Sequence, residues 1–144
     1  MIITDTEVLR NKCVHVLEDE VDDLRKKLDE ALEWSARQGR PGVGLACPQI
    51  GISKSMAIVR VDNHKVDLVN ASIVKRYHPF EFEGEGCLSF PGIFAKTLRY
   101  QEIVVEGNLV WPYSFIANDF LAVVIAHELD HLSGILLPDI AISS

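Results

Sequence analysis

The chain lacks the features that mark secreted and membrane proteins. Its three cysteines are odd in number and have no disulfide-framework spacing, so we expect reduced thiols. The longest dense apolar run, residues 120–126, is much shorter than the ~20 residues of a membrane span. Residues 1–10 have neither the charged start and apolar core of a secretory signal nor the basic character of a transit peptide. By default, these absences predict a cytoplasmic protein.

Basic residues are also scarce, with 14 Lys and Arg against 21 Asp and Glu and a formal net charge of -7. Nonspecific binding to nucleic acid needs a basic surface, so this balance argues against a nucleic-acid partner. Apolar residues, in contrast, are plentiful, at 48% of 144 residues. That content is enough for the core of one domain, which we expect to span residues 1–144.

The segment most typical of an enzyme runs from His127 to His131, with Glu128 and Asp130 between the two histidines. On a helix, histidines four residues apart lie on one face, so both imidazoles can bind one metal beside a carboxylate. The preceding run, 120–125, is too continuously apolar for the surface, which predicts a buried helix with Asn118 as N-cap. In isolation, however, such a histidine pair is more often a pair of satisfied core residues.

A catalytic metal keeps an open position when the protein supplies three ligands, and the sequence after His131 offers no third one. Leu137 stands where some metalloproteases with this helix have a third histidine, and no glutamate follows Glu128. The third ligand must therefore come from upstream. The best candidate is Cys87, a thiolate donor in the strand-like segment 85–89. With this cysteine and Glu128 present, a metal site becomes the favoured interpretation.

These motifs and a glycine-rich segment resemble the peptide deformylase family, whose members carry three motifs in a fixed order. The motifs here are Gly42 to Gln49, Glu85 to Ser89 and His127 to His131. Each is a moderate or weak signal alone, but the ordered triple is highly specific. The resemblance extends from Leu9 to Leu137.

This chain departs from the family pattern at three points. Cys47 replaces a usual alanine, Ala126 replaces a usual glutamine, and the long C-terminal helix of bacterial members is missing. None of these changes removes a catalytic residue. The missing helix means that the resemblance does not carry ribosome docking over to this chain.

The predicted chemistry is metal-dependent hydrolysis of an amide. A divalent ion held by Cys87, His127 and His131 lowers the pKa of its bound water, so a metal-bound hydroxide can be the nucleophile. Glu128, which is too constrained to bind the metal well itself, is placed as general base and then acid. The ligand set alone suggests Zn2+. The resemblance implies Fe2+ in the cell, with Ni2+ or Co2+ as active substitutes.

The resemblance also implies how substrate binds. The Gln49 side chain and the Leu88 backbone N–H share the developing oxyanion with the metal. Gly42 and Gly44 let an extended peptide come close to the backbone, so we expect it to add as a strand along Val43, Gly44 and Gly86. The methionine pocket of the family falls on four residues that are all apolar here: Val43, Phe120, Val123 and Val124. The implied reaction releases formate from N-formylmethionyl peptides of nascent proteins.

The remaining sequence predicts an α+β fold of mostly antiparallel sheets wrapped around the central metal-binding helix. Apolar residues at helical spacing indicate a helix over about residues 18–38 that ends at Gly39. The connections between the later strands are too short for parallel crossovers. These strands are expected at 56–61, 65–70, 72–77, 97–100 and 102–110, separated by turn residues that include Pro79 and Gly84.

Several residues have more than one interpretation. Glu85 and Arg99 form a supporting ion pair by resemblance, but Arg99 could equally be exposed. Asp130 is expected to hold a buried polar partner near the helix. We expect an inert buried thiol at Cys47, a small buried residue at Cys13, and surface histidines at 15, 64 and 78.

Two other functions stay open at this point. One is a related metallohydrolase that acts on another small amide, and the other is an inactive, metal-stabilised module that captures extended peptides. Glu128 and Gln49 argue against the binding module, because binding alone needs neither. We expect a monomer that acts on free peptides, with no membrane or nucleic-acid partner.

Overall fold

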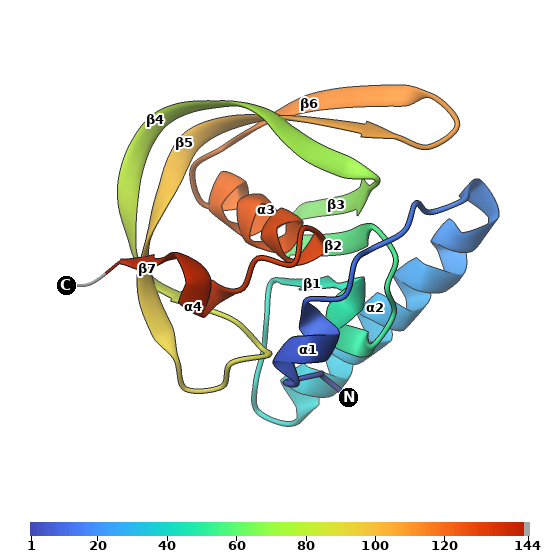
Figure 1. The fold of residues 1–144 in the computed structure, drawn as a ribbon, viewed down its shortest axis with the longest axis horizontal. Helices are drawn as coiled ribbons and strands as arrows, with labels where there is room; N and C mark the ends of the chain where they lie inside the picture. Colours follow the sequence, from blue (N-terminus) through green and yellow to red (C-terminus); the bar gives the residue numbers. More distant parts are fainter. Residues whose placement is uncertain (143–144) are drawn as a thin grey trace.

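Two antiparallel sheets enclose one buried helix in the computed structural model, which describes residues 1–142 (Figure 1). The enclosed helix is α3 (Asp119–Leu132), and its contacts with strands of both sheets make it the centre of the fold. The predicted α+β architecture around a central helix is therefore confirmed. No helix within residues 1–142 is long and apolar enough to cross a membrane.

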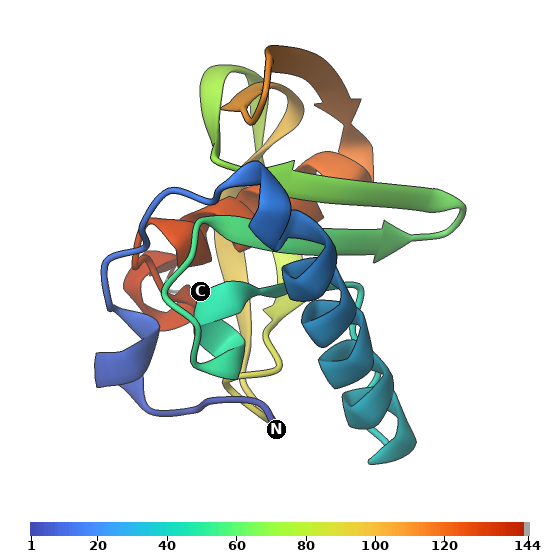
Figure 2. The same ribbon diagram turned by 90° about the vertical axis from the view of Figure 1, so that its right-hand side faces the viewer.

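The first sheet is covered on both faces. It has the order β1 (Gly44–Ala46), β2 (Met56–Val61) and β3 (His64–Val69). Side chains of β2 alternate: Met56 and Ile58 join the core cluster of helix α2, while Ala57 and Val59 join the cluster of α3. Figure 2 shows α2 on the outer side of this sheet. Burial on both faces explains why β2 begins with four consecutive apolar residues, Met56 to Val59.

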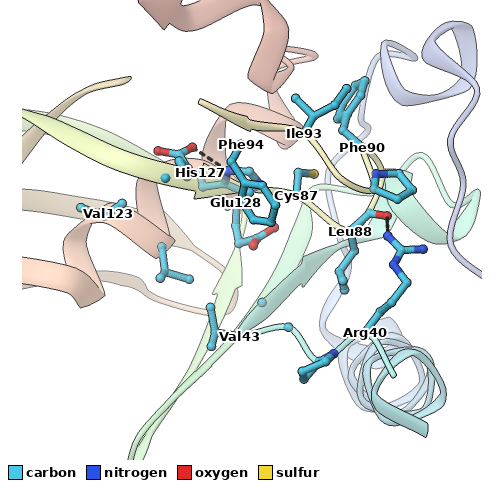
Figure 3. Close-up of a pocket in the computed structure, with 18 of the residues that line it drawn as sticks. Arg40, Val43, Cys87, Leu88, Phe90, Ile93, Phe94, Val123, His127 and Glu128 are labelled. Atoms are coloured by element: carbon cyan, nitrogen blue, oxygen red, sulfur yellow. Dashed lines mark hydrogen bonds and ion pairs between the residues drawn. The ribbon is translucent and has the colours of Figure 1, made fainter. Parts of the chain in front are cut away.

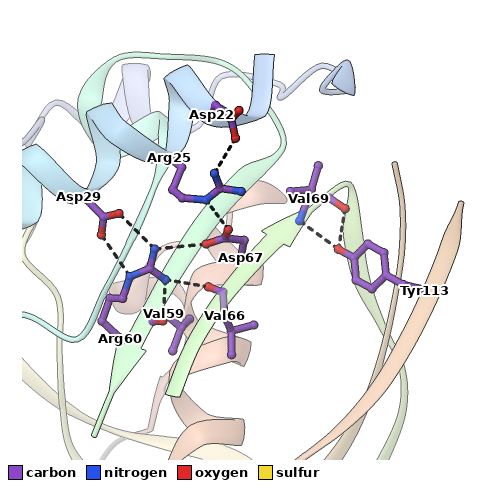
Figure 4. Close-up of polar contacts among 9 residues, drawn as sticks. All are labelled: Asp22, Arg25, Asp29, Val59, Arg60, Val66, Asp67, Val69 and Tyr113. Carbon is purple, nitrogen blue, oxygen red and sulfur yellow. Dashed lines mark hydrogen bonds and ion pairs between the residues drawn. The ribbon is translucent and has the colours of Figure 1, made fainter. Parts of the chain in front are cut away.

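A network of ion pairs fixes α2 (Val21–Arg37) to the first sheet (Figure 4). Arg60 of β2 donates to Asp29 of α2 at 3.1 and 3.2 Å and to Asp67 of β3 at 3.2 Å. Arg25 of α2 donates to the same Asp67. Two charged residues of α2, Arg25 and Asp29, therefore form ion pairs with the sheet instead of facing solvent alone.

The second sheet has the order β4 (Ala71–Gly86), β5 (Phe94–Asn108) and β6 (Pro112–Asn118), and the short strand β7 (Ala141–Ile142) also pairs with β5. Irregular pairing of β4 with β5 at two places, Ile73/Lys75 and Phe82/Glu85, indicates β-bulges. Bulges bend a strand, and the sheet curves over α3 (Figure 1). Tyr113 of β6 joins the two sheets, because its hydroxyl donates to the Val69 carbonyl at 2.7 Å and accepts from the Val69 N–H at 3.0 Å.

The strand boundaries correct part of the sequence prediction. The strands at 56–61 and 65–70 are confirmed within one residue, but the expected breaks at Pro79 and Gly84 are wrong, because β4 runs through both residues. Pro79 lies inside β4 opposite Tyr100, and β4 is an edge strand, the place in a sheet where proline is tolerated. Residues 97–100 and 102–110 belong largely to the single strand β5, and β6 was not predicted.

The helix boundaries agree better with the prediction. The helix expected over 18–38 consists of a 3₁₀ turn, Glu18–Glu20, followed by α2, and it ends before Gly39 at φ +83°. Asn118 is the N-cap of α3 by position, although its side chain makes no capping hydrogen bond. Past the end of α3, Gly134 has φ +74°. The other short helices are α1 (Thr6–Leu9), the 3₁₀ turn Cys47–Ile50 and α4 (Leu137–Ile140).

The expectations for the minor residues are largely confirmed. Cys47 is buried, and burial raises the pKa of its thiol to about 12, as for an inert thiol. The histidines at 15, 64 and 78 are exposed. Cys13 is only partly buried, so that expectation was wrong, because the residue lies in an irregular N-terminal segment outside the core clusters.

Candidate metal centre

Three potential ligands lie close together where the end of β4 meets α3. Helix α3 carries His127 and His131, whose ring centroids lie 5.0 Å apart, and Cys87 directly follows β4. The Sγ of Cys87 lies 3.3 Å from Nε2 of His131, and one donor atom from each residue falls within 4.8 Å of the others. Bonds of ~2.0–2.3 Å in a tetrahedral site put neighbouring donors roughly 3.3–3.6 Å apart. The three predicted ligands are therefore close enough to share one ion.

His127 is held in orientation by a buried carboxylate. Its Nδ1 lies 2.8 Å from Oε2 of Glu85, which leaves Nε2 for a metal. Arg99 donates to both oxygens of Glu85, at 2.8 and 2.5 Å, and the hydroxyl of Thr97 donates to Oε1 at 2.7 Å. Glu85 and Arg99 are each 5% exposed, so the predicted ion pair is confirmed as a buried one. Such a carboxylate fixes the tautomer and the ring of a metal-binding histidine.

The same network keeps Glu85 ionised. Burial would raise the pKa of Glu85, but hydrogen bonds and charge from Arg99 and His127 outweigh it and lower the pKa to about 2. Asp130 accepts a hydrogen bond from Arg99 at 2.9 Å, which confirms its predicted role as partner of a buried polar group. Burial raises the pKa of Asp130. Arg99 thus ties the metal helix to β4 through two carboxylates.

The second histidine is held as a neutral ring. Burial and the charge of His127 lower the pKa of His131 to about 3, and a neutral imidazole is the form that binds a metal. Burial would also lower the pKa of His127, but hydrogen bonds with Cys87 and Glu85 raise it well above its ordinary value. Groups that can carry negative charge, Glu85 and Glu128 among them, therefore surround His127, and a divalent cation would balance that charge.

Glu128 lies in the cavity beside these ligands. It is 3% exposed, and its Oε1 has no hydrogen-bond partner among residues 1–142. Its Oε2 is so close to β1 that a Cβ at Gly44 would lie 2.5 Å from it. Burial raises the pKa of Glu128 to about 7. A buried carboxylate with a free oxygen and a pKa near neutrality can accept and release a proton.

Gln49 is also buried and fixed. Its Oε1 accepts from the Ala46 N–H at 3.0 Å, so its Nε2 points to Ser89 Oγ at 3.1 Å and lies 3.6 Å from Cys87 Sγ. The carbonyl of Leu88 accepts a hydrogen bond from Arg40 at 2.6 Å, which fixes the backbone next to Cys87. Sequence reasoning did not single out Ser89 or Thr97. Ser89 had a signal, because it lies two residues from Cys87 in the same motif.

A cavity of about 450 Å³ contains the predicted substrate-binding residues (Figure 3). Val123 and Val124 are buried at its wall, whereas Val43 and Phe120 are 40% and 46% exposed. Sequence reasoning also missed its aromatic lining from Phe82, Phe90 and Phe94, which lie outside the ordered motifs. Of the predicted site residues, His131 alone does not line the cavity; those that do are Val43, Gly44, Gln49, Gly86, Cys87, Leu88, Phe120, Val123, Val124, His127 and Glu128.

A Cys-His-His ligand set in contact with a cavity, beside a buried carboxylate that has one oxygen without a partner among the described residues, is the arrangement of a metal-dependent hydrolase. The chain matches the polypeptide deformylase family over residues 1–144, and it belongs to that family. It is 38% identical to the peptide deformylase of Syntrophomonas wolfei, with 100% of this chain and 93% of the relative covered. It is 34% identical to that of Borreliella burgdorferi, with 96% and 85% covered.

The fold agrees with solved structures of the same family. The crystal structure of peptide deformylase from Thermotoga maritima superimposes with a TM-score of 0.85 at 31% identity, covering 99% of this chain and 97% of that one. A peptide deformylase of Plasmodium falciparum, solved in complex with an inhibitor, gives a TM-score of 0.84 at 28% identity and covers 99% and 90%. The predicted family resemblance is confirmed.

Proposed function

We propose that this chain hydrolyses the N-formyl group of N-formylmethionyl peptides of nascent proteins and releases formate. Membership of the polypeptide deformylase family supports the reaction. The main structural support is that Cys87, His127 and His131 have donor atoms within 4.8 Å of one another, and that the buried Glu128 lines the same cavity as Cys87 and His127.

The donor set fits a divalent cation. Sγ of Cys87, Nε2 of His127 and Nε2 of His131 would hold it, because Nδ1 of His127 is engaged by Glu85 and Nε2 of His131 faces the thiol. When bound, such a cation lowers the pKa of a coordinated water and polarises a carbonyl. For the cell we propose Fe2+, with Zn2+, Ni2+ and Co2+ able to occupy the same ligands. Metal analysis of protein purified without oxygen tests this choice.

Glu128 is the proposed general base. Its Oε1 is free of partners among the described residues, so it can take the proton of the attacking water and pass it to the leaving amine. Gly44 makes this position possible, because any side chain there would meet the carboxylate. Position 44, which lies beside Glu128 in space, is therefore a glycine for a steric reason.

Gln49 and Leu88 are the proposed donors to the carbonyl oxygen as negative charge develops on it. Ala46 fixes the amide of Gln49 so that Nε2 faces the side of Cys87, and Arg40 donates to the Leu88 carbonyl, which holds the chain immediately after the Leu88 N–H. Donors that are held in place before the reaction stabilise the transition state without further reorganisation.

The formylated peptide is proposed to bind as an added strand. β1 is an edge strand that pairs with β2 on one side, so its other edge is available along Val43 and Gly44. Gly86 lines the same cavity and gives the peptide a close approach to the backbone of β4. The methionine side chain then enters the apolar pocket formed by Val43, Phe120, Val123 and Val124.

In the cell, we propose a cytoplasmic monomer that acts on free peptide ends without docking to ribosomes. Its three free cysteines support a reducing compartment. Its net charge of -7 opposes binding to ribosomal RNA. Size-exclusion chromatography and co-sedimentation with ribosomes at physiological salt test the two points.

Formate release from formyl-Met-Ala-Ser by the metal-loaded protein tests the reaction. Acetyl-Met-Ala-Ser and formyl-Glu-Ala-Ser are the matched control substrates, and we expect much slower turnover of both. Rapid hydrolysis of the acetyl peptide would indicate a general amide hydrolase. Binding of formyl-Met-Ala-Ser without any turnover would indicate a peptide-binding module.

A further inference from the structure

Thr97 is a fully buried polar residue of β5, and none of the three ordered motifs contains it. A buried hydroxyl costs free energy unless it finds an acceptor, whereas a valine of nearly the same shape fills the same space without this requirement. The hydroxyl of Thr97 has a close acceptor, Oε1 of Glu85 at 2.7 Å. The side chain of Thr97 therefore does more than fill the core, because it also holds a buried carboxylate.

The hydroxyl of Thr97 completes the set of partners around the Glu85 carboxylate. A carboxylate has about four acceptor positions on its two oxygens. Oε1 accepts from Thr97 and from Nε of Arg99 at 2.8 Å, while Oε2 accepts from Nη2 of Arg99 at 2.5 Å and faces Nδ1 of His127 at 2.8 Å. Thr97 and Arg99, two residues apart in β5, thus hold the carboxylate from one face of this strand. His127 meets it from α3.

Thr97 also lies opposite the irregular part of β4. Its register partner is Phe82, the last paired residue before the bulge, and the next pair joins Glu85 to Ala95. The hydrogen bond from Thr97 to Glu85 therefore crosses the bulge. Because a bulge leaves residues unpaired and disrupts the ladder locally, strand pairing alone fixes the direction of the Glu85 side chain poorly. The hydroxyl supplies the fixed point that the ladder lacks there.

The C-terminal strand β7 encloses Thr97 from the other side. Thr97 pairs with Ala141 of β7 as well as with β4, so its backbone has a strand on each side, and Figure 1 shows β7 next to this part of β5. The ion pair of Arg10 with Asp139 at 2.8 Å holds α4, which directly precedes β7. A hydrogen bond that is shielded from water is stronger than an exposed one. The position of Thr97 is therefore well suited to orient the carboxylate.

We propose that Thr97 is a positioning residue of the metal site. Its hydroxyl fixes the Glu85 carboxylate at the bulge, and Glu85 in turn fixes the ring of His127 with Nε2 free for the metal. This inference rests on the metal site of the proposed function, and it adds to that site a residue from outside the ordered motifs. Thr97 belongs to neither the ligand set nor the cavity lining, so it acts only through Glu85.

Metal affinity of three variants tests this role, measured by competition of Ni2+ and Co2+ with a chelator. Thr97→Val removes the hydroxyl and keeps the shape, and we expect about tenfold weaker affinity, the lower end of the range for residues behind a metal ligand. Thr97→Ser keeps the hydroxyl and should keep an affinity close to that of the wild type. Thr97→Ala is a second variant without the hydroxyl and should lose as much affinity as Thr97→Val. Ser72→Ala is the matched control, because it removes an exposed hydroxyl near the other end of β4 and should change nothing.

The visible absorption spectrum of the Co2+ form gives a second measurement, because it reports the geometry of the ligands without any turnover. We expect an altered spectrum in Thr97→Val and a wild-type spectrum in Thr97→Ser. A lower Tm of metal-free Thr97→Val with unchanged metal affinity and spectrum would show a purely structural role and overturn the proposal. Equal loss of affinity in Thr97→Ser would overturn it as well, because packing of the methyl group would then be responsible. Neither measurement uses formate release, so the positioning role can fail while the proposed function holds, and the reverse.

Discussion

Replacing Glu85 with Gln should weaken the support of His127 while leaving the three metal ligands, Cys87, His127 and His131, in the chain. Glu85 accepts two hydrogen bonds from Arg99 and one from Thr97, and it faces Nδ1 of His127 at 2.8 Å. Gln keeps the size of the side chain but loses the charge and turns one oxygen into an NH2 group. That NH2 meets a donor, either the guanidinium of Arg99 or the N–H of His127. The variant therefore leaves the buried guanidinium of Arg99 with Asp130 as its remaining carboxylate partner.

The expected cost follows from the burial of the pair. Removing one partner of a buried ion pair typically costs about 3–5 kcal/mol. Gln can still accept one hydrogen bond. We therefore expect the free energy of unfolding of the metal-free protein to fall by about 3 kcal/mol, which lowers Tm by about 10 °C. Loss of a carboxylate behind a metal-binding histidine weakens metal affinity by about 10–100-fold. Thermal unfolding of the metal-free protein and competition with a chelator measure the two effects separately.

Glu83→Gln is the matched control. Glu83 lies two residues earlier in β4, its side chain is 76% exposed and it pairs with Lys96 at 3.5 Å. Exposed pairs contribute about 0–1 kcal/mol, so this variant should keep both Tm and metal affinity. Equal effects of the two substitutions, or wild-type metal affinity in Glu85→Gln, would show that Glu85 does not orient His127.

The other predictions concern the metal, the general base Glu128 and the ion pair between Arg10 and Asp139, whose side chains meet at 2.8 Å. Glu128→Gln should keep about one metal per chain while formate release falls by at least ~100-fold, and retained turnover would remove Glu128 from its role. Cys87→Ala should lose both metal and activity, whereas full metal occupancy would place the third ligand elsewhere. Iron-loaded protein should lose activity in air as the iron and Cys87 oxidise, and nickel-loaded protein should persist; equal half-lives would contradict an iron–thiolate site. Hydrogen bonds from Arg10 and from the Leu136 N–H lower the pKa of Asp139 to about 2. The stabilisation by Asp139 is therefore full above the unfolded pKa of ~3.9 and is lost as pH falls through the folded value. Asp139→Asn should lower Tm at pH 7 and have a much smaller effect near pH 2, where Asp139 is already partly protonated. An effect of equal size at both pH values would contradict a stabilising Arg10–Asp139 ion pair.

Local rules explain why the metal helix was predictable. The spacing of His127 and His131 places both on one face of a helix whatever the rest of the chain does, and the apolar run before them requires burial. The same holds for α2, with its helical period and the glycine after it. The closeness of Cys87 to α3 depends on the whole fold, and it was indicated by the need for an upstream third ligand and by the order of three motifs in a known family. The aromatic lining from Phe82 and Phe94 had no comparable signal.

The support of His127 could not be predicted, because it depends on one irregularity in β4. Phe82 and Glu85 both line the cavity on the side of α3, where Phe82 stacks on Phe120 and Glu85 faces His127. Two residues three apart point to opposite faces of a regular strand. The bulge between Phe82 and Glu85 adds one residue to β4, and Gly84 accommodates it with φ +75°. The sequence displays Gly84 plainly, but a glycine there indicates a strand end as readily as a bulge inside one strand. The pairing of β4 with β5 decides between a strand end and a bulge. The role of Gly84 in directing Glu85 toward α3 could therefore be predicted only if that pairing were already known.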